Sequence, residues 1–207
     1  LSSDGPVESA ILSIIASHLR PPQTTSTTKR NKTDLGPWSS YRIDLHNATL
    51  TEQAYFVNCR FKQLDLRRAT LFGRVIFSES HFFEAASFEY STFKQVVDFS
   101  QAHFDFHSSF QGAEFKKDAL FDNAEFNSTS NFSEVTFAGN SRFYGTVFSG
   151  ICDFSDSTFI QDTCFKETEF NLAYFRKCTF RQSADFTPNK IETLKRTWVL
   201  DSDGSLL

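Results

Sequence analysis

The sequence of 207 residues contains no methionine and only two tryptophans. No apolar run approaches the roughly 18 residues that would indicate a membrane-spanning helix. The formal net charge is only −4, so the chain lacks the basic surface that nucleic-acid-binding proteins need, and we expect no direct nucleic acid binding. Because methionine is absent and the sequence opens on Leu1, we expect a segment of a longer chain. We therefore expect a cytoplasmic protein that contacts a membrane only through an anchor upstream of Leu1.

Catalytic and cofactor motifs are also missing. No nucleophile elbow, phosphate-binding loop or dinucleotide fingerprint occurs. The cysteines, at positions 59, 152, 164 and 178, do not match the spacing of a zinc site, and we interpret them as reduced structural thiols. His103 and His107 lie four residues apart within a five-residue repeat, so they should not converge on a metal. These observations predict no catalytic residues, no metal and no cofactor, and hence no enzyme.

Phenylalanine is strongly enriched instead, with 26 residues. From Phe99 onward it recurs in steps that alternate between five and six residues, a period that neither a helix nor an ordinary strand produces. A fixed period of this kind indicates a repeat architecture. The core positions of the regular stretch are Phe99, Phe104, Phe110, Phe115, Phe121, Phe126, Phe132, Phe137, Phe143, Phe148, Phe154, Phe159, Phe165 and Phe170.

The same register extends in both directions to 27 positions, four of them leucine. The residue two before each position is mostly small, as at Ala113 and Ser130, although His81 takes that place before Phe83. We therefore expect one large and one small side chain of each repeat to face inward. The register starts at Leu45, passes through Phe83 and ends at Phe186, leaving Phe72, Phe82 and Phe106 outside it.

The unit small–polar–large–polar–polar resembles that of the pentapeptide-repeat family, and residues 42–50 (RIDLHNATL) are a close instance. The alternation of five and six residues is similar to Phe-rich bacterial, actinobacterial members. The resemblance covers about 145 of the 207 residues. It implies an all-β solenoid, a right-handed quadrilateral β-helix with four repeats per coil. The 27 positions would then form about seven coils over residues 41–187.

Four units of alternating length make a coil of 22 residues, so phenylalanines 22 apart should stack in columns. A coil spacing of about 4.7–4.9 Å suits stacked aromatic rings. In several six-residue units the third residue after the phenylalanine is Asp118, Asn140 or Asp162. Because Asp and Asn favour turns, we expect the extra residue to bulge outward at a corner. The two clearest predicted columns are Phe99, Phe121, Phe143, Phe165 and Phe104, Phe126, Phe148, Phe170.

Within the N-terminal segment 1–20, residues 6–19 are predicted to form a helix with Val7, Ile11, Ile14, Ile15 and Leu19 near one face. We expect this helix to dock on the open end of the repeat region. A membrane-surface helix is the alternative, but its polar face has almost no Lys or Arg. Residues 21–40 are polar and Thr-rich and are predicted to be a flexible linker, at the end of which Trp38 introduces the repeats.

The C-terminal segment 188–207 is predicted to begin with a second helix, over residues 188–200. Its Ile191, Leu194 and Trp198 lie on one face. A solenoid must cover its last coil, so we expect this face to act as a cap. The alternative is a homodimer formed through the C-terminal helix.

Twelve carboxylates and four Lys or Arg lie between Asp98 and Glu169, a net charge of −8. This charge is compatible with two functions. We expect a non-catalytic structural or protein-interaction module, a rigid Phe-cored rod with an unknown protein partner, possible as part of a larger membrane-tethered protein. The alternative, which the family resemblance implies, is a DNA-mimicking regulator of a gyrase-type topoisomerase.

Overall fold

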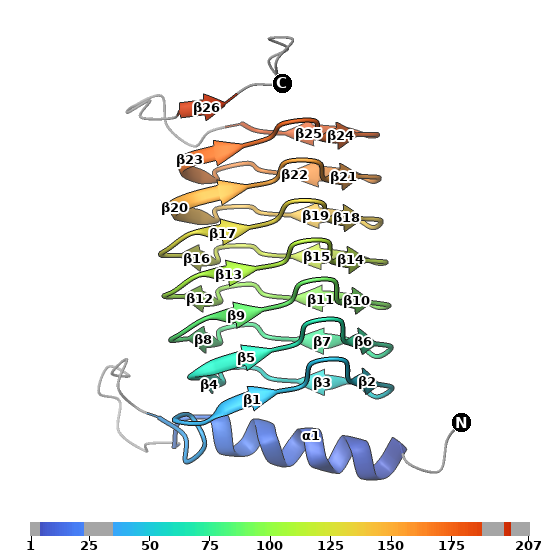
Figure 1. The fold of residues 1–207 in the computed structure, drawn as a ribbon, viewed down its shortest axis with the longest axis vertical. Coiled ribbons are helices and arrows are strands. Elements are labelled where there is room, and N and C mark those ends of the chain that lie inside the picture. The colour runs from blue at the N-terminus through green and yellow to red at the C-terminus, as the bar shows by residue number, and fades with distance from the viewer. Residues whose placement is uncertain (1–4, 23–34, 188–196, 200–207) are drawn as a thin grey trace.

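Figure 1 shows the computed structural model, which describes residues 5–22, 35–187 and 197–199. The chain forms a parallel β-solenoid of about seven coils, and the helix α1 (Gly5–Leu19) lies across the open end of the first coil. This confirms the predicted solenoid, while the right hand of its coil stays a prediction. Within the described ranges, no helix is long and apolar enough to cross a membrane.

Short strands lie in four columns along the rod, and every pairing between successive coils is parallel. The first column contains β1 (Arg42–Asp44), β5 (Gln63–Asp65), β9 (Ala86–Ser87), β13 (Ser108–Ser109) and β17 (Ser130–Asn131). The second contains β2 (Thr49–Leu50), β6 (Thr70–Leu71), β10 (Thr92–Phe93), β14 (Glu114–Phe115), β18 (Thr136–Phe137), β21 (Thr158–Phe159) and β24 (Thr179–Phe180). The third contains β3 (Ala54–Tyr55), β7 (Val75–Ile76), β11 (Val97–Asp98), β15 (Ala119–Leu120), β19 (Ser141–Arg142), β22 (Thr163–Cys164) and β25 (Ala184–Asp185).

The fourth column joins the first near the C-terminal end of the rod. It contains β4 (Arg60–Phe61), β8 (His81–Phe82), β12 (His103–Phe104) and β16 (Glu125–Phe126). The longer β20 (Val147–Asp153) then pairs with both β16 and β17, and β23 (Glu169–Tyr174) pairs with β20. These contacts merge two walls into one sheet, so three sheets surround the core.

The pairing register gives the coil its length. In the middle of the rod a residue pairs with the one 22 positions later, as Phe104 does with Phe126. At the two ends the offset is 21, as between Arg42 and Gln63 and between Thr158 and Thr179. The shorter coils arise because the units that follow Phe61 and Phe170 have five residues where the regular pattern has six.

Phenylalanine rings fill the interior in the columns that the spacing predicts. Phe121 lies 5.1 Å from Phe99 and 4.9 Å from Phe143, centroid to centroid, with the rings almost parallel. Neighbouring columns meet edge to face, as where Phe110 and Phe121 are 5.5 Å apart at 88°. Both arrangements are favourable for aromatic rings, so the core is held by stacking along the rod and by edge contacts across it.

One position of the predicted register is wrong. Phe82, not Phe83, occupies the core column, because its ring is fully buried and stacks on Phe61 at 5.0 Å. The small inward position is therefore Ser80, which is also fully buried, and His81 lies in the outer wall with its ring 4.2 Å from that of Phe83. Two adjacent phenylalanines fit the spacing almost equally well, and the side-chain alternation of the strand selects Phe82.

Two kinds of corner alternate around each coil. In the six-residue units the extra residue lies between strands, as expected: β14 ends at Phe115 and β15 begins at Ala119. The left-handed conformation occurs instead in the five-residue units, two positions after the core residue, and is adopted by Asn47, Asn58, Arg68, Glu79, Tyr90, Gln101, Gly112, Asn123, Glu134, Gly145, Asp156, Glu167 and Lys177.

Polar side chains just before the core positions stabilise these turns. Asn131 Oδ1 accepts a hydrogen bond from the backbone N–H of Ser133 at 2.9 Å, and Asp153 Oδ1 accepts one from Ser155 at 2.8 Å. Asp118, in a six-residue corner, instead accepts from the backbone N–H of Asn140 in the next coil, at 2.9 Å. Asp and Asn thus serve both as turn formers and as links between coils.

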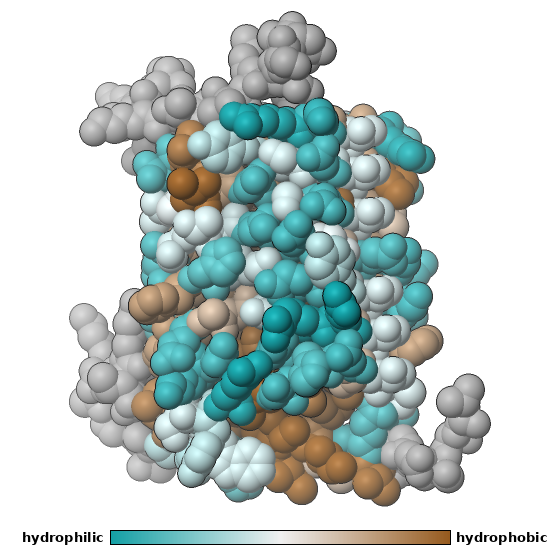
Figure 2. All heavy atoms as spheres, viewed as in Figure 1, coloured by the Kyte–Doolittle hydropathy of each residue, from teal (hydrophilic) through white to brown (hydrophobic). Residues whose placement is uncertain are grey.

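The helix α1 docks on the first coil as predicted, but through a different face. Leu12, Ala16 and Leu19 are buried against the solenoid. Val7 and Ile11 are 59% and 53% exposed, although the periodicity placed them on the docked face. Figure 2 shows hydrophobic residues gathered over α1, beneath walls that are mostly hydrophilic. Aliphatic residues occur all around this helix, so periodicity alone could not select the buried face.

The segment that follows α1 is packed where the structure describes it. The backbone N–H of Trp38 bonds to His18 O at 3.0 Å, and the Trp38 and His18 rings stack at 4.3 Å. Gly36 approaches so closely that a Cβ there would lie 2.4 Å from His18 O. The central part of the predicted linker, residues 23–34, lies outside the described residues.

The predicted C-terminal helix falls mostly outside the described residues, as do its Ile191 and Leu194. At positions 197–199 the prediction is wrong, because the strand β26 (Thr197–Val199), which contains Trp198, pairs in parallel with β23. This strand adds a further row to the sheet and so covers backbone groups of β23 that would form its edge.

Candidate functional site

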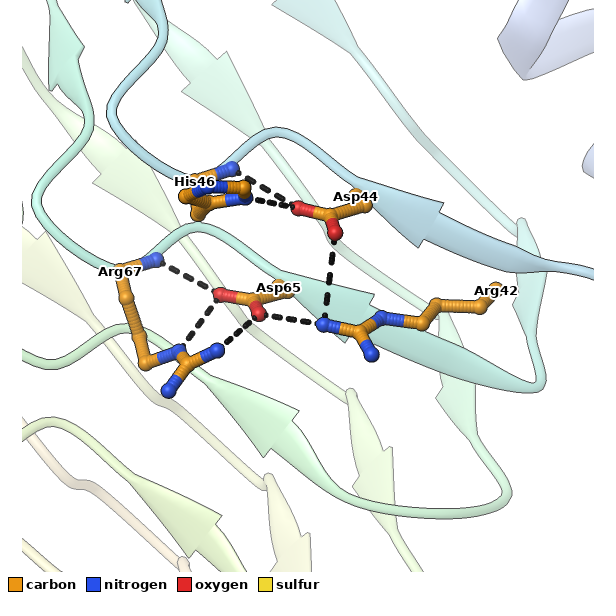
Figure 3. A network of polar contacts seen from close by, with 5 residues as sticks. All are labelled: Arg42, Asp44, His46, Asp65 and Arg67. Atoms are coloured by element: carbon orange, nitrogen blue, oxygen red, sulfur yellow. Dashed lines mark hydrogen bonds and ion pairs between the residues drawn. The ribbon is translucent and has the colours of Figure 1, made fainter.

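Five charged or titratable side chains form a polar network on the first two coils (Figure 3). Arg42 and Asp44 come from β1, Asp65 from β5, and His46 and Arg67 from the turns that follow these strands. The parallel register places Asp44 directly beside Asp65. Two carboxylates this close would repel each other, so the neighbouring cations are needed to stabilise the pair.

Asp65 is the centre of the network and is only 2% exposed. Arg67 donates from Nε to Asp65 Oδ1 at 2.9 Å and from Nη2 to Oδ2 at 2.6 Å, and Arg42 Nη2 donates to Oδ2 at 2.7 Å. These bonds, chiefly those from Arg67, lower the pKa of Asp65 to about 2. The carboxylate therefore stays ionised at neutral pH and is a poor general base.

Asp44, His46 and Asp65 also form the one group of three potential metal ligands among the described residues, with ligand atoms within 4.8 Å of one another. The group does not fit a metal ion. Both oxygens of Asp65 already accept hydrogen bonds from arginine, and His46 Nδ1 donates to Asp44 Oδ1 at 2.6 Å, which lowers the pKa of Asp44. A divalent ion would have to compete with two guanidinium groups, so we interpret the network as a brace between the coils.

An open recess of about 380 Å³ lies beside this brace, along the corner of the first column. Ligand sites are usually concave and mostly apolar. This recess is lined almost wholly by polar and charged side chains, so it lacks the apolar lining that a small-molecule site requires. The lining residues are His46, Asn47, Arg67, Arg68, Glu89 and Tyr90.

A second group of titratable residues lies on the fourth column. His81 Nε2 donates to Asp105 Oδ2 at 2.7 Å, and His103 Nδ1 donates to Glu125 Oε2 at 2.9 Å. The two imidazole rings are 5.7 Å apart, in adjacent coils. Burial lowers the pKa of His81 despite its bond to Asp105. The sequence gave His81 an inward position, so this ladder of His–carboxylate pairs was not predicted.

The comparison with protein-family models finds a match to pentapeptide repeats, over residues 77–122, 107–146 and 143–188. Together these segments cover more than half of the chain. The chain belongs to the pentapeptide-repeat family. No curated protein and no solved structure matches it.

The cysteines of this pentapeptide-repeat protein occupy the positions expected of structural thiols. All four are free, and Cys59 and Cys152 are buried in the small inward positions. Burial raises the pKa of Cys59 to about 12 and raises that of Cys152 as well. Such thiols stay protonated and are poor nucleophiles. Cys164 is half-buried in the outer wall, one position before Phe165, as the repeat predicts.

The residues that the sequence marks as important in this pentapeptide-repeat protein are thus mostly core residues. Thirteen of the fourteen phenylalanines from Phe99 to Phe165 and Phe170 itself are buried in the four columns. They form the interior and expose no functional group. The charged residues of the brace were not singled out from the sequence, although the offset between residues 44 and 65 could have brought them together.

Proposed function

We propose that the protein is a non-catalytic structural or protein-interaction module, a rigid rod with a phenylalanine core. The filled interior is the observation that supports this most directly. Phe121 and Phe132, for example, are completely buried and lie 5.5 Å apart, edge to face. Binding and catalytic sites favour concave pockets, and a core filled in this way leaves the outer walls as the functional surface.

The acidic stretch is the feature that would favour the alternative, a DNA-mimicking regulator of a gyrase-type topoisomerase. Many of its carboxylates have partners within the rod. Asp98 Oδ1 accepts from the backbone N–H of Ser100 at 2.8 Å, and Asp122 forms an ion pair with Arg142 at 2.6 Å. Since these carboxylates stabilise turns and neighbouring coils, their number is explained without a topoisomerase partner, and their charge favours solubility.

A supercoiling assay separates the two proposals. We expect purified protein at micromolar concentration to leave DNA gyrase activity unchanged. Inhibition or protection of gyrase that is lost on neutralising the acidic stretch would favour the DNA mimic and contradict our proposal.

Photo-crosslinking tests the interaction module itself. A photoreactive residue would replace one exposed hydrophobic side chain on each part of the rod surface: Tyr55 (52% exposed), Phe72 (49%), Phe106 (62%) or Ile151 (40%). We expect covalent protein adducts in cells from a subset of these positions, because a rod that binds a partner presents one wall to it. If no position yields a protein adduct above the level seen with unreactive phenylalanine, the proposal is wrong.

A further inference from the structure

The outward face of α1 is apolar along its length. Val7, Ile11 and Ile14 recur at the spacing of one helical face and are 59%, 53% and 49% exposed. Ala10, Ser13 and Ser17 are exposed beside them and are all small. We call these six residues the outer face of α1; it is the hydrophobic patch at the base of the rod in Figure 2.

The charged side chains at the ends of α1 turn toward the solenoid. Glu8 accepts hydrogen bonds from the backbone N–H and the hydroxyl of Thr51, at 2.7 and 2.6 Å. Arg20, just after the helix, donates to Val57 O at 3.1 Å and to Tyr55 O at 2.9 Å. A surface helix normally carries its charges on the face toward water. Here the charges anchor the helix, and the outer face consists only of apolar and small polar residues.

Other parts of the given sequence are poor candidates to cover this face. Residues 23–34 (QTTSTTKRNKTD) contain no aliphatic or aromatic side chain, and residues 1–4 contain only Leu1. Residues 188–207 follow β25, which lies at the opposite end of the rod (Figure 1). A membrane surface would require basic residues beside the apolar face, but Arg20 is bound to backbone carbonyls.

We propose that the outer face of α1 packs against the same face of a second copy of this chain. A two-fold contact joins identical surfaces, so it brings like charges together unless the surface is uncharged. The outer face meets this condition, and its small residues allow two helices to approach closely. Ile11 lies near the middle of the stripe, close to the expected two-fold axis. The resulting dimer joins two rods base to base and leaves all outer walls accessible.

The contact is smaller than that of a permanent dimer. The helix has 15 residues and is about 22 Å long, so one helix per copy buries less than the roughly 1,200–2,000 Å² of a stable interface. We therefore expect a dimer that dissociates on dilution.

Analytical ultracentrifugation across a wide range of protein concentrations tests this proposal. We expect the wild-type protein to shift from monomer to dimer as the concentration rises and Ile11→Glu to remain monomeric. Phe106→Glu is the matched control, because Phe106 is 62% exposed on the rod wall, and this variant should dimerise like wild type. Circular dichroism and thermal melting confirm that each variant is folded.

A charge-pairing experiment adds a positive test. Ile11→Lys should also be monomeric, and an equimolar mixture of Ile11→Lys and Ile11→Glu should recover dimer. A wild-type protein that stays monomeric throughout, or an Ile11→Glu variant that dimerises normally, would overturn the proposal. So would a monomeric protein that binds phosphatidylglycerol vesicles through Ile11, since the outer face would then be a membrane contact.

Discussion

Phe82 and Phe83 are adjacent residues on opposite sides of one wall, so substituting each in turn tests the register of the rod. Phe82 is fully buried, with its ring 5.0 Å from Phe61 and 4.5 Å from Phe104. Phe83 is half-buried on the outside, against His81. The two alanine variants remove the same atoms from the same strand region, so any difference in their stability reports on burial alone.

The expected difference is large. Replacement of a buried phenylalanine by alanine costs about 3–5 kcal/mol. Phe82 is stacked on both sides, and each such contact contributes about 0.5–1.5 kcal/mol beyond burial, which places Phe82→Ala near the upper end of that range. Phe83→Ala leaves a gap that water can enter, so we expect a loss of about 1 kcal/mol.

Urea unfolding followed by circular dichroism measures both losses, with the m-value as a check that the same surface unfolds in each variant. Phe106→Ala serves as the exposed control, with an expected change within about 0.5 kcal/mol. Equal losses for Phe82→Ala and Phe83→Ala, or a larger loss for Phe83→Ala, would refute the register and place Phe83 in the core column.

Three further predictions follow from individual contacts. Asp65→Asn should destabilise the protein by about 1–2 kcal/mol at pH 7, a value discounted because its arginine partners are half-exposed; since the pKa of Asp65 is lowered to about 2, the difference from wild type in urea unfolding should be complete above about pH 4 and vanish as pH falls toward 2. The pKa of His81 is lowered by burial, so wild-type stability should fall as pH drops below about 6.5, and His81→Gln should show a flatter stability profile over pH 7 to 5; an identical profile would contradict this. Gly150→Ala should cost about 1–3 kcal/mol in thermal or urea unfolding, because the new Cβ would lie 2.4 Å from the Ser128 backbone; an unchanged stability would show that this corner relaxes freely.

The sequence predicts the architecture because one repeated spacing determines the columns. The positions of Phe121 and Phe143 in one column follow from their separation of 22 residues, and no other property of the chain is needed. The register failed at Phe83 because Phe82 beside it has the same chemistry, and spacing alone cannot resolve a shift of one residue. Only the alternation of side chains in β8 decides which ring enters the core.

Features that depend on contacts between coils were harder to predict. The brace around Asp65 requires knowing that the first coil has 21 residues, which aligns Asp44 with Asp65. The buried face of α1 could not be chosen, because Leu12 and Ile11 are both aliphatic and both fit a helical stripe. The solenoid decides between them by binding Glu8 at one end of the helix.

The alternation of two corner types makes 11 residues the smallest interchangeable length of this rod. Each half-coil contains one five-residue unit with a left-handed residue and one six-residue unit, as Gln101 and Gly112 illustrate. Loss or gain of 22 residues would return every later side chain to the same wall and change the length of the rod by one strand spacing, about 4.7–4.9 Å. Loss of 11 would instead turn everything beyond it by half a revolution. A gene encoding such a rod can therefore change its length in small fixed steps while keeping the orientation of whatever its two ends hold.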